Sequence, residues 1–146
     1  MTATQTQPSS WILLAEDNQA DVYLVRTSLK EHGIAHDLRV AKDGEEAIDL
    51  ITGADSGGLV PGLVLLDLNL PKKTGQEILE HLRDTPRWAG VPVIIMSSSD
   101  SPTDRAKAAR LGIRAYFRKP SRLDEFMRLG GIVKKVLQES TPSSTE

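Results

Sequence analysis

The fold is decided by one stretch of the chain, Leu63-Val64-Leu65-Leu66-Asp67-Leu68-Asn69-Leu70-Pro71. It begins with four consecutive apolar residues, turns polar at an acid and closes on a proline. A short apolar run bounded by turn-forming residues is typical of a strand that is covered on both faces. Residues 11–15 and 93–96 have the same apolar character. Three such strands predict a parallel sheet with helices packed on each side.

Two further strands are predicted at residues 36–41 and 115–118. They carry more polar residues than the other three, so we expect them at the edges of the sheet. Segments of helical period separate the five strands. The chain is therefore predicted to be an α/β domain in which five βα units, joined by right-handed crossovers, form an open five-stranded parallel sheet.

Helix boundaries are marked by polar caps and by glycines. The predicted starts are a capping-box pair, a close variant of it and a serine followed by a first-turn proline: Thr74 with Glu77, Asp43 with Glu46, and Ser101 with Pro102. The predicted ends lie at three glycines: Gly33, Gly53 and Gly112.

The last predicted helix covers residues 122–138 and contains Gly130 and Gly131. Each glycine is about 1 kcal/mol less favourable than alanine inside a helix. Either another helix approaches so closely that no side chain fits, or the helix is bent or frayed at the glycines.

Composition excludes several classes of protein. A length of 146 residues matches one domain. The chain has 18 Lys and Arg residues against 20 Asp and Glu residues, a net charge of −2, so no basic excess favours nucleic acid or an anionic membrane. It has no cysteine, which excludes disulfides, Cys-ligated zinc and thiol catalysis.

Both ends of the chain are polar. Residues 1–10 and 139–146 are rich in Ser, Thr, Pro and Gln, so we expect disordered tails around a domain that spans residues 11–138. The first ten residues lack the basic start and apolar run of a secretory signal. No stretch approaches the roughly 18 apolar residues of a membrane span. We therefore expect a cytoplasmic protein with no membrane partner.

Polar side chains follow four of the predicted strands. Glu16 and Asp17 follow the first strand, Asp67 the third, Ser97 the fourth and Lys119 the fifth. Ligands of open parallel sheets bind outside the carboxyl ends of the strands. Three carboxylates at close range repel one another unless they share a cation, and oxygen ligands without His or Cys suit Mg²⁺. The sequence thus predicts a magnesium site at this edge.

The chain has three histidines, His32, His36 and His81. They fall in helical or edge segments, where we expect solvated surface side chains. No histidine is therefore expected to serve as the base for a serine nucleophile.

Four motifs in this order resemble the receiver domain of two-component response regulators. They are Glu16-Asp17, the stretch 67–71 followed by Gly75, Ser97, and Lys119-Pro120. Each motif is weak alone, but the combination at successive strand ends is specific. The resemblance spans about residues 11–138 and implies a flavodoxin-like (βα)5 fold with strand order 2-1-3-4-5.

The resemblance also implies roles for individual residues. Asp67 resembles the phosphoacceptor, which takes a phosphoryl group from a histidine kinase. Asp17 and Asp67 would bind Mg²⁺ through their side chains, Asn69 through its backbone carbonyl, and Glu16 through a bound water.

Ser97 and Lys119 would contact phosphoryl oxygens. Ser97 would move toward the phosphoryl group and Tyr116, on the fifth strand, would turn into the space that it leaves. The fourth helix, fifth strand and last helix would then present a changed surface to a downstream protein.

A narrower resemblance rests on residues 67–73, on the long connection 52–62 and on the few residues that follow the last helix. These features resemble the short response regulators paired with phytochrome-class histidine kinases. They lead us to expect a stand-alone response regulator that acts by protein contact and forms a homodimer through its last helix.

Two alternatives stay open. An Asp-nucleophile phosphatase of the haloacid dehalogenase type needs a second acid two residues after the nucleophile, where this chain has Asn69. A docking module that works without phosphorylation would use the same scaffold, although degenerate receivers usually lose an acid or the lysine that this chain retains.

Overall fold

A computed structural model describes residues 11–53, 60–99 and 101–140 of the chain. Five strands form one parallel sheet in the order β2-β1-β3-β4-β5, which confirms the predicted fold class and strand order. The strands are β1 (Trp11–Ala15), β2 (Asp37–Ala41), β3 (Leu63–Asp67), β4 (Val93–Ser97) and β5 (Ala115–Arg118). The two more polar strands, β2 and β5, lie at the edges as expected, since only one neighbour pairs with each.

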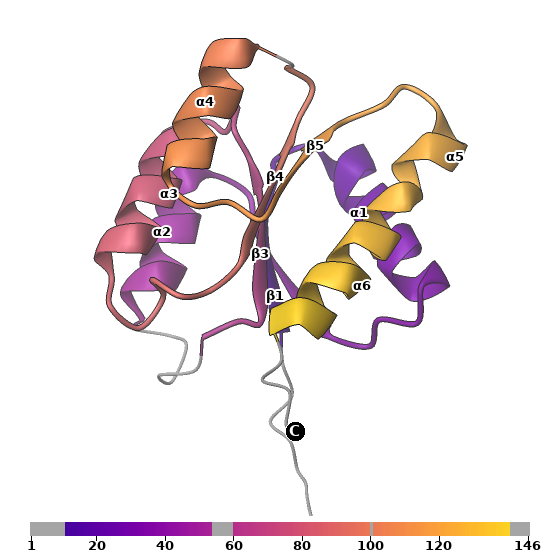
Figure 1. Ribbon diagram of the computed structural model, residues 1–146, viewed down its shortest axis with the longest axis horizontal. Helices are drawn as coiled ribbons and strands as arrows, with labels where there is room; N and C mark the ends of the chain where they lie inside the picture. The colour runs from indigo at the N-terminus through magenta and orange to yellow at the C-terminus, as the bar shows by residue number, and fades with distance from the viewer. Residues whose placement is uncertain (1–10, 54–59, 100, 141–146) are drawn as a thin grey trace, which may run out of the picture.

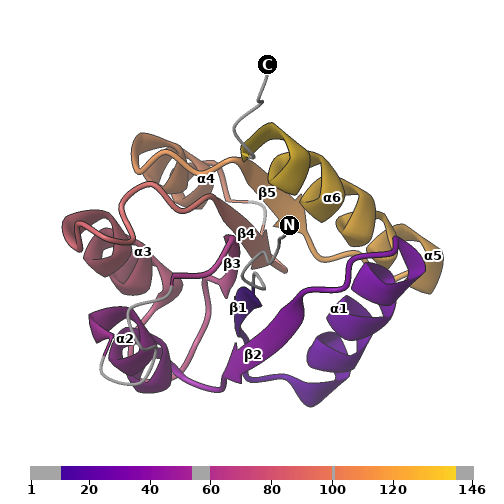
Figure 2. The same ribbon diagram turned by 90° about the horizontal axis from the view of Figure 1, so that it is seen from below.

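Helices cover both faces of the sheet (Figures 1 and 2). They are α1 (Gln19–Glu31), α2 (Gly44–Thr52), α3 (Gly75–Asp84), α4 (Pro102–Arg110), α5 (Leu123–Phe126) and α6 (Arg128–Ser140). Figure 2 shows α2, α3 and α4 along one face and α1, α5 and α6 along the other. Neighbouring residues of each central strand therefore enter different cores: Leu66 packs with the α3 residue Leu79, and Leu65 with the α6 residue Leu129. This double burial explains why the central strands are apolar throughout.

The caps and glycine ends predicted for the first four helices are confirmed. Thr74 and Glu77 form a full capping box, in which the backbone N–H of Thr74 donates to Oε1 of Glu77 at 2.9 Å. Asp43 and Ser101 likewise cap α2 and α4 with their side chains. The three terminating glycines all have positive φ, the backbone region in which glycine is least strained: Gly33 at 72°, Gly53 at 91° and Gly112 at 74°.

The prediction of one continuous last helix over residues 122–138 is wrong. The helix is interrupted at Met127 and continues as α6 to Ser140, two residues beyond the predicted end. The buried hydroxyl of Ser28 causes the interruption, because it donates to the carbonyl of Met127 and accepts from the N–H of Gly130, both at 2.7 Å. A side chain inserted into the helical hydrogen-bond ladder breaks it locally.

Close helix packing explains Gly130, the first of the two alternatives. A Cβ at Gly130 would overlap with the Ser28 carbonyl and the His32 ring, whereas one at Gly131 would make ordinary contacts. The helices α1 and α6 are therefore in close contact at Gly130. The predicted tail at residues 1–10, residues 141–146 of the other tail, and residues 54–59 of the long connection lie outside the described residues.

Candidate functional site

Three carboxylates meet at the carboxyl edge of the sheet. Glu16, Asp17 and Asp67 each offer one oxygen, and these oxygens lie within 4.8 Å of one another. The parallel pairing of β1 with β3 aligns Ala15 with Leu66, so the residues that follow come side by side. Glu16 and Asp67 are buried, whereas Asp17 is exposed. The cluster is therefore open to solvent on the side of Asp17.

The loop after β3 is held in a fixed turn. The backbone N–H of Asn69 donates to Oδ1 of Asp67 at 3.0 Å. The N–H of Gly75 donates to the carbonyl of Leu68 at 3.0 Å, and a Cβ at Gly75 would overlap with the Asp67 carbonyl. Glycine at this position thus lets α3 begin directly beneath Asp67.

The ammonium of Lys119 joins the cluster from β5. Its Nζ lies 2.7 Å from Oε1 of Glu16, 2.8 Å from Oδ2 of Asp21 and 3.0 Å from Oδ2 of Asp67. The sequence analysis missed Asp21, which lies in the first turn of α1. The available signal was an acid in the first turn of the helix that begins directly after the Glu16-Asp17 pair.

Burial and charge shift the titration of this cluster. Burial raises the pKa of Glu16 to about 7, with a further contribution from the charge of Asp67, and Lys119 only partly opposes the rise. Burial disfavours the charged form of Lys119, but its ion pairs with Asp21 and Glu16 outweigh this effect and raise its pKa above the usual range. Lys119 is therefore a permanent cation, and Glu16 exchanges its proton near neutral pH.

The donor set fits a hard divalent cation. Three carboxylate oxygens converge, and one of the three acids faces solvent. Lys119 balances only one of the four negative charges around it when all four acids are ionised. The remaining charge and the absence of His or Cys from the converging group favour an oxygen-liganded ion such as Mg²⁺. The part predicted for the backbone carbonyl of Asn69 stays a prediction.

Ser97 and Tyr116 lie on adjacent strands and meet the same residue. Ser97 is fully buried, and its Oγ accepts a hydrogen bond from the N–H of Ser99 at 3.0 Å. The hydroxyl of Tyr116 donates to the carbonyl of Ser99 at 2.9 Å, and the guanidinium of Arg105 stacks 4.3 Å from the centre of its ring. The backbone N–H of Lys119 donates to the Ser97 carbonyl at 2.7 Å. Ser97 is therefore hydrogen-bonded both to the backbone of Lys119 and to Ser99, the residue that Tyr116 also contacts.

The histidines lie away from this cluster, as expected, but all three are partly buried rather than fully solvated. His32 is half-buried, and its Nδ1–H donates to the Ser28 carbonyl at 2.9 Å. Burial lowers the pKa of His36, and Nε2 of His81 is buried without a hydrogen-bond partner within the described residues.

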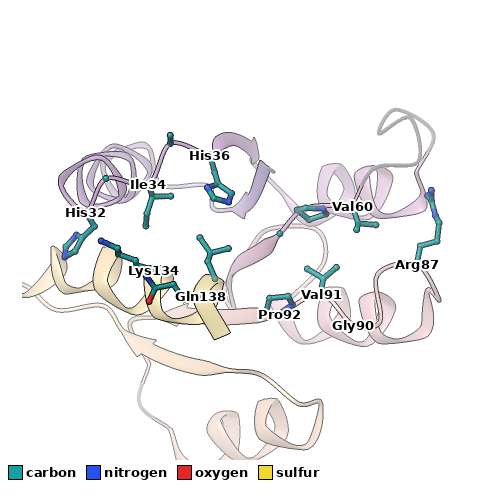
Figure 3. Close-up of a pocket in the computed structure, with 15 residues that line it drawn as sticks. His32, Ile34, His36, Val60, Arg87, Gly90, Val91, Pro92, Lys134 and Gln138 are labelled. Carbon is teal, nitrogen blue, oxygen red and sulfur yellow. The ribbon is translucent and has the colours of Figure 1, made fainter. Parts of the chain in front are cut away.

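His32 and His36 line a hollow of about 730 Å³ elsewhere on the molecule (Figure 3). Figure 3 shows His32 next to Lys134 of α6, with His36, Val60 and Arg87 further along. The lining includes no carboxylate and no member of the acidic cluster. The convergence of acids, ammonium and hydroxyl is therefore a feature of the strand ends and not of this hollow.

Comparison with known proteins agrees with this geometry. The model of the response regulator receiver domain matches residues 12–129. The chain belongs to the response regulator receiver family. Receiver domains of this family act in two-component signalling together with histidine kinases.

The receiver is similar to proteins of cyanobacterial phytochrome systems. It is 33% identical to the response regulator Rcp1 of Synechocystis over 127 residues, which cover 86% of each chain. The solved structure of the phosphorylated cyanobacterial phytochrome response regulator RcpA superposes with a TM-score of 0.83 at 32% identity, covering 92% of this chain and 99% of RcpA. The Mn²⁺-bound form of Rcp1 gives a TM-score of 0.81 at 32% identity, covering 94% of this chain and 99% of Rcp1.

Within the ranges that the structure describes, no helix of the receiver combines the length and apolar character that a membrane crossing requires.

Proposed function

We propose that this receiver accepts a phosphoryl group from a histidine kinase onto Asp67, with Mg²⁺ bound beside it, and that phosphorylation switches a protein-binding surface. One observation carries the proposal: the ammonium of Lys119 lies 3.0 Å from Asp67, whose carboxylate also converges with those of Glu16 and Asp17. Phosphoryl transfer needs positioning and charge neutralisation more than covalent help, and this cluster supplies both.

In the proposed step, a carboxylate oxygen of Asp67 attacks the phosphorus of a phosphohistidine. The new P–O bond forms as the P–N bond breaks, and the electron pair leaves with the imidazole. Lys119 and the hydroxyl of Ser97 each donate to an oxygen of the transferred group. Asp17, Asp67 and the Asn69 carbonyl would hold Mg²⁺, with Glu16 acting through a bound water, and the ion would supply further positive charge beside those oxygens. Attack of water on phosphorus later breaks the bond to Asp67, which releases inorganic phosphate and restores the carboxylate.

The switch follows from the contacts of Ser99. When Ser97 turns toward the phosphoryl group it gives up the N–H of Ser99, and Tyr116 leaves the Ser99 carbonyl for the vacated space. Ser99 also donates to Asp104 in the first turn of α4 at 3.2 Å, so the change reaches that helix. Couplings of this kind are worth about 1–3 kcal/mol, enough to change the affinity of a partner or of a second copy.

We propose a phytochrome-class kinase as the phosphoryl donor, because the phytochrome response regulators are similar over nearly the whole chain. A test incubates the receiver and radiolabelled ATP with a purified phytochrome histidine kinase and, in parallel, with an unrelated histidine kinase, in light and in darkness. Light-dependent transfer from the phytochrome kinase alone is expected. Equal transfer from both kinases would reject the phytochrome assignment, and transfer from neither would reject the phosphoacceptor role.

Two readouts separate the alternatives. Self-association that is unchanged by beryllofluoride, measured by light scattering, would favour the docking module over the switch. Catalytic turnover of a chromogenic phosphate ester would favour the phosphatase, for which Asn69 offers no carboxyl group as general acid.

A further inference from the structure

We propose that Asp21 is a positioning residue of the phosphoryl-transfer site, which holds the ammonium of Lys119 against Asp67 from the side of α1. The inference rests on the proposed function and adds to it a residue that lies outside the four motifs of the receiver family. It also makes the first turn of α1 part of the reacting site.

The hydrogen-bonding capacity of Lys119 is fully used. An ammonium has three N–H donors, and Nζ has three carboxylate partners at 2.7, 2.8 and 3.0 Å, in Glu16, Asp21 and Asp67. The three acids come from different elements: the end of β1, the first turn of α1 and the end of β3. Two of the donors are held by acids that do not react. The third is thereby directed at Asp67, the acid that does.

Asp21 is itself held in place. Its backbone N–H donates to the side chain of Asn18, the N-cap of α1, at 3.0 Å. The N–H of Asn18 in turn donates to Oε2 of Glu16 at 3.1 Å. These hydrogen bonds join Glu16, Asn18 and Asp21 in one turn. The turn fixes the positions of the Glu16 and Asp21 carboxylates relative to each other and to Lys119.

The distances distinguish positioning from sequestration. If Asp21 drew Lys119 away from the reacting centre, Nζ would be near Asp21 and far from Asp67. Instead, Nζ contacts both acids at once. Asp21 also lies outside the group of three carboxylates that converge within 4.8 Å, so it acts on the ammonium and is not one of the candidate metal ligands.

Once Asp67 is phosphorylated, its carboxyl oxygen becomes a weaker hydrogen-bond acceptor. A phosphoryl oxygen then accepts from the third N–H of Lys119. Glu16 and Asp21 keep the other two donors through this exchange. The ammonium of Lys119 is therefore already in position when the phosphoryl group arrives. A cation that need not reorient stabilises the developing charge more effectively.

The first experiment measures labelling by acetyl phosphate in Mg²⁺, with acetate as the leaving group, for wild type, Asp21→Asn, Asp21→Glu and Glu45→Gln. Glu45 is the matched control, because it is an exposed acid in the first turn of α2 that pairs with Lys72 at 3.5 Å. We expect Asp21→Asn to be labelled about tenfold more slowly, the effect of one partly exposed charged hydrogen bond. Asp21→Glu should recover most of the rate, and Glu45→Gln should match wild type.

The outcomes are distinguishable. Wild type that takes no label would overturn the proposed function and this inference with it. Wild type and Asp21→Asn that are labelled at the same rate would overturn the role of Asp21 alone. A slow rate in Asp21→Glu equal to that of Asp21→Asn would show that the carboxylate is not what matters.

The second experiment needs neither metal nor phosphoryl donor. In EDTA, acylation of Lys119 by an acetylating reagent, followed by peptide mass spectrometry, reports how firmly the amine is held. Its rate should rise at least about threefold in Asp21→Asn and stay unchanged in Glu45→Gln, since one charged partner is lost. The exposed Lys30 serves as an internal reference. An unchanged rate at Lys119 in a folded Asp21→Asn variant would contradict the proposal.

Discussion

Nζ of Lys119 lies 3.0 Å from Oδ2 of Asp67, although 52 residues separate them in the sequence. Their strands, β5 and β3, are not neighbours, because β4 runs between them. The lysine crosses the end of β4 where Ser97 is small and buried, and its own backbone is bonded to Ser97. The side chains of Lys119 and Asp67, together with the hydrogen bond between them, span about two strand spacings. A small residue at the end of β4 is therefore a condition for this contact.

Replacing Asp67 by Asn should abolish labelling by acetyl phosphate, because an amide cannot form the acyl phosphate. Asp49→Asn, which changes an exposed acid of α2, is the control and should be labelled like wild type. The measurement is a phosphate-affinity gel. Label that persists on Asp67→Asn would assign the phosphoacceptor to another residue.

Replacing Lys119 by Ala should uncouple phosphorylation from the change in self-association that follows it. The variant should take label more slowly than Asp21→Asn, and once labelled it should not change its self-association, since no ammonium grips the phosphoryl group. Removing the cation from beside two buried carboxylates should also lower the free energy of unfolding, by about 3 kcal/mol.

For Lys119→Ala, light scattering of labelled and unlabelled samples gives the molar mass, and urea denaturation gives the stability. A gain in self-association on labelling, equal to that of wild type, would argue against the role of Lys119 in the switch.

Divalent metal affinity should depend on pH. Because burial raises the pKa of Glu16 to about 7, the folded protein keeps a proton that the unfolded chain loses at lower pH. This group therefore contributes stability below its ordinary pKa, and the contribution is lost as the pH rises through about 7. Mg²⁺ requires the ionised acid, so its apparent affinity should rise about tenfold from pH 6 to pH 8.

Calorimetric titration with Mg²⁺ at the two pH values tests this dependence. The variant Glu16→Gln should bind more weakly and with a flatter pH profile, since the group that titrates is gone. A tenfold rise that persists in Glu16→Gln would assign the titration to a different acid.

Adding one methyl group at Gly130 should destabilise the protein. The Cβ would overlap with the Ser28 carbonyl and the His32 ring, so Gly130→Ala should lower the free energy of unfolding by about 2 kcal/mol. Gly131→Ala is the matched control, with ordinary contacts in the same helix, and should raise it by up to about 1 kcal/mol. Urea denaturation measures both. Equal effects of the two substitutions would show that α1 and α6 are not in close contact there.

The sequence by itself determined the fold class and most of the site. Strands that are buried on both faces must be apolar throughout, as in Leu63–Leu66, and parallel strands bring their carboxyl ends to one edge. The apolar runs and the shared carboxyl edge of parallel strands therefore predicted that Glu16, Asp67 and Lys119 would meet. The caps of α2, α3 and α4 were equally readable, because they depend on residues three positions apart.

Only the tertiary structure decided the contacts between elements that are distant in sequence. The hydroxyl of Ser28 interrupts the last helix at Met127, 99 residues away, and no local pattern in that helix marks the break. Asp21 joins Lys119 across 98 residues because the start of α1 and the residue that follows β5 come together at the carboxyl edge of the sheet. Propensity and periodicity report on a residue's own segment, whereas hydrogen bonds between packed segments depend on where the whole chain places each partner.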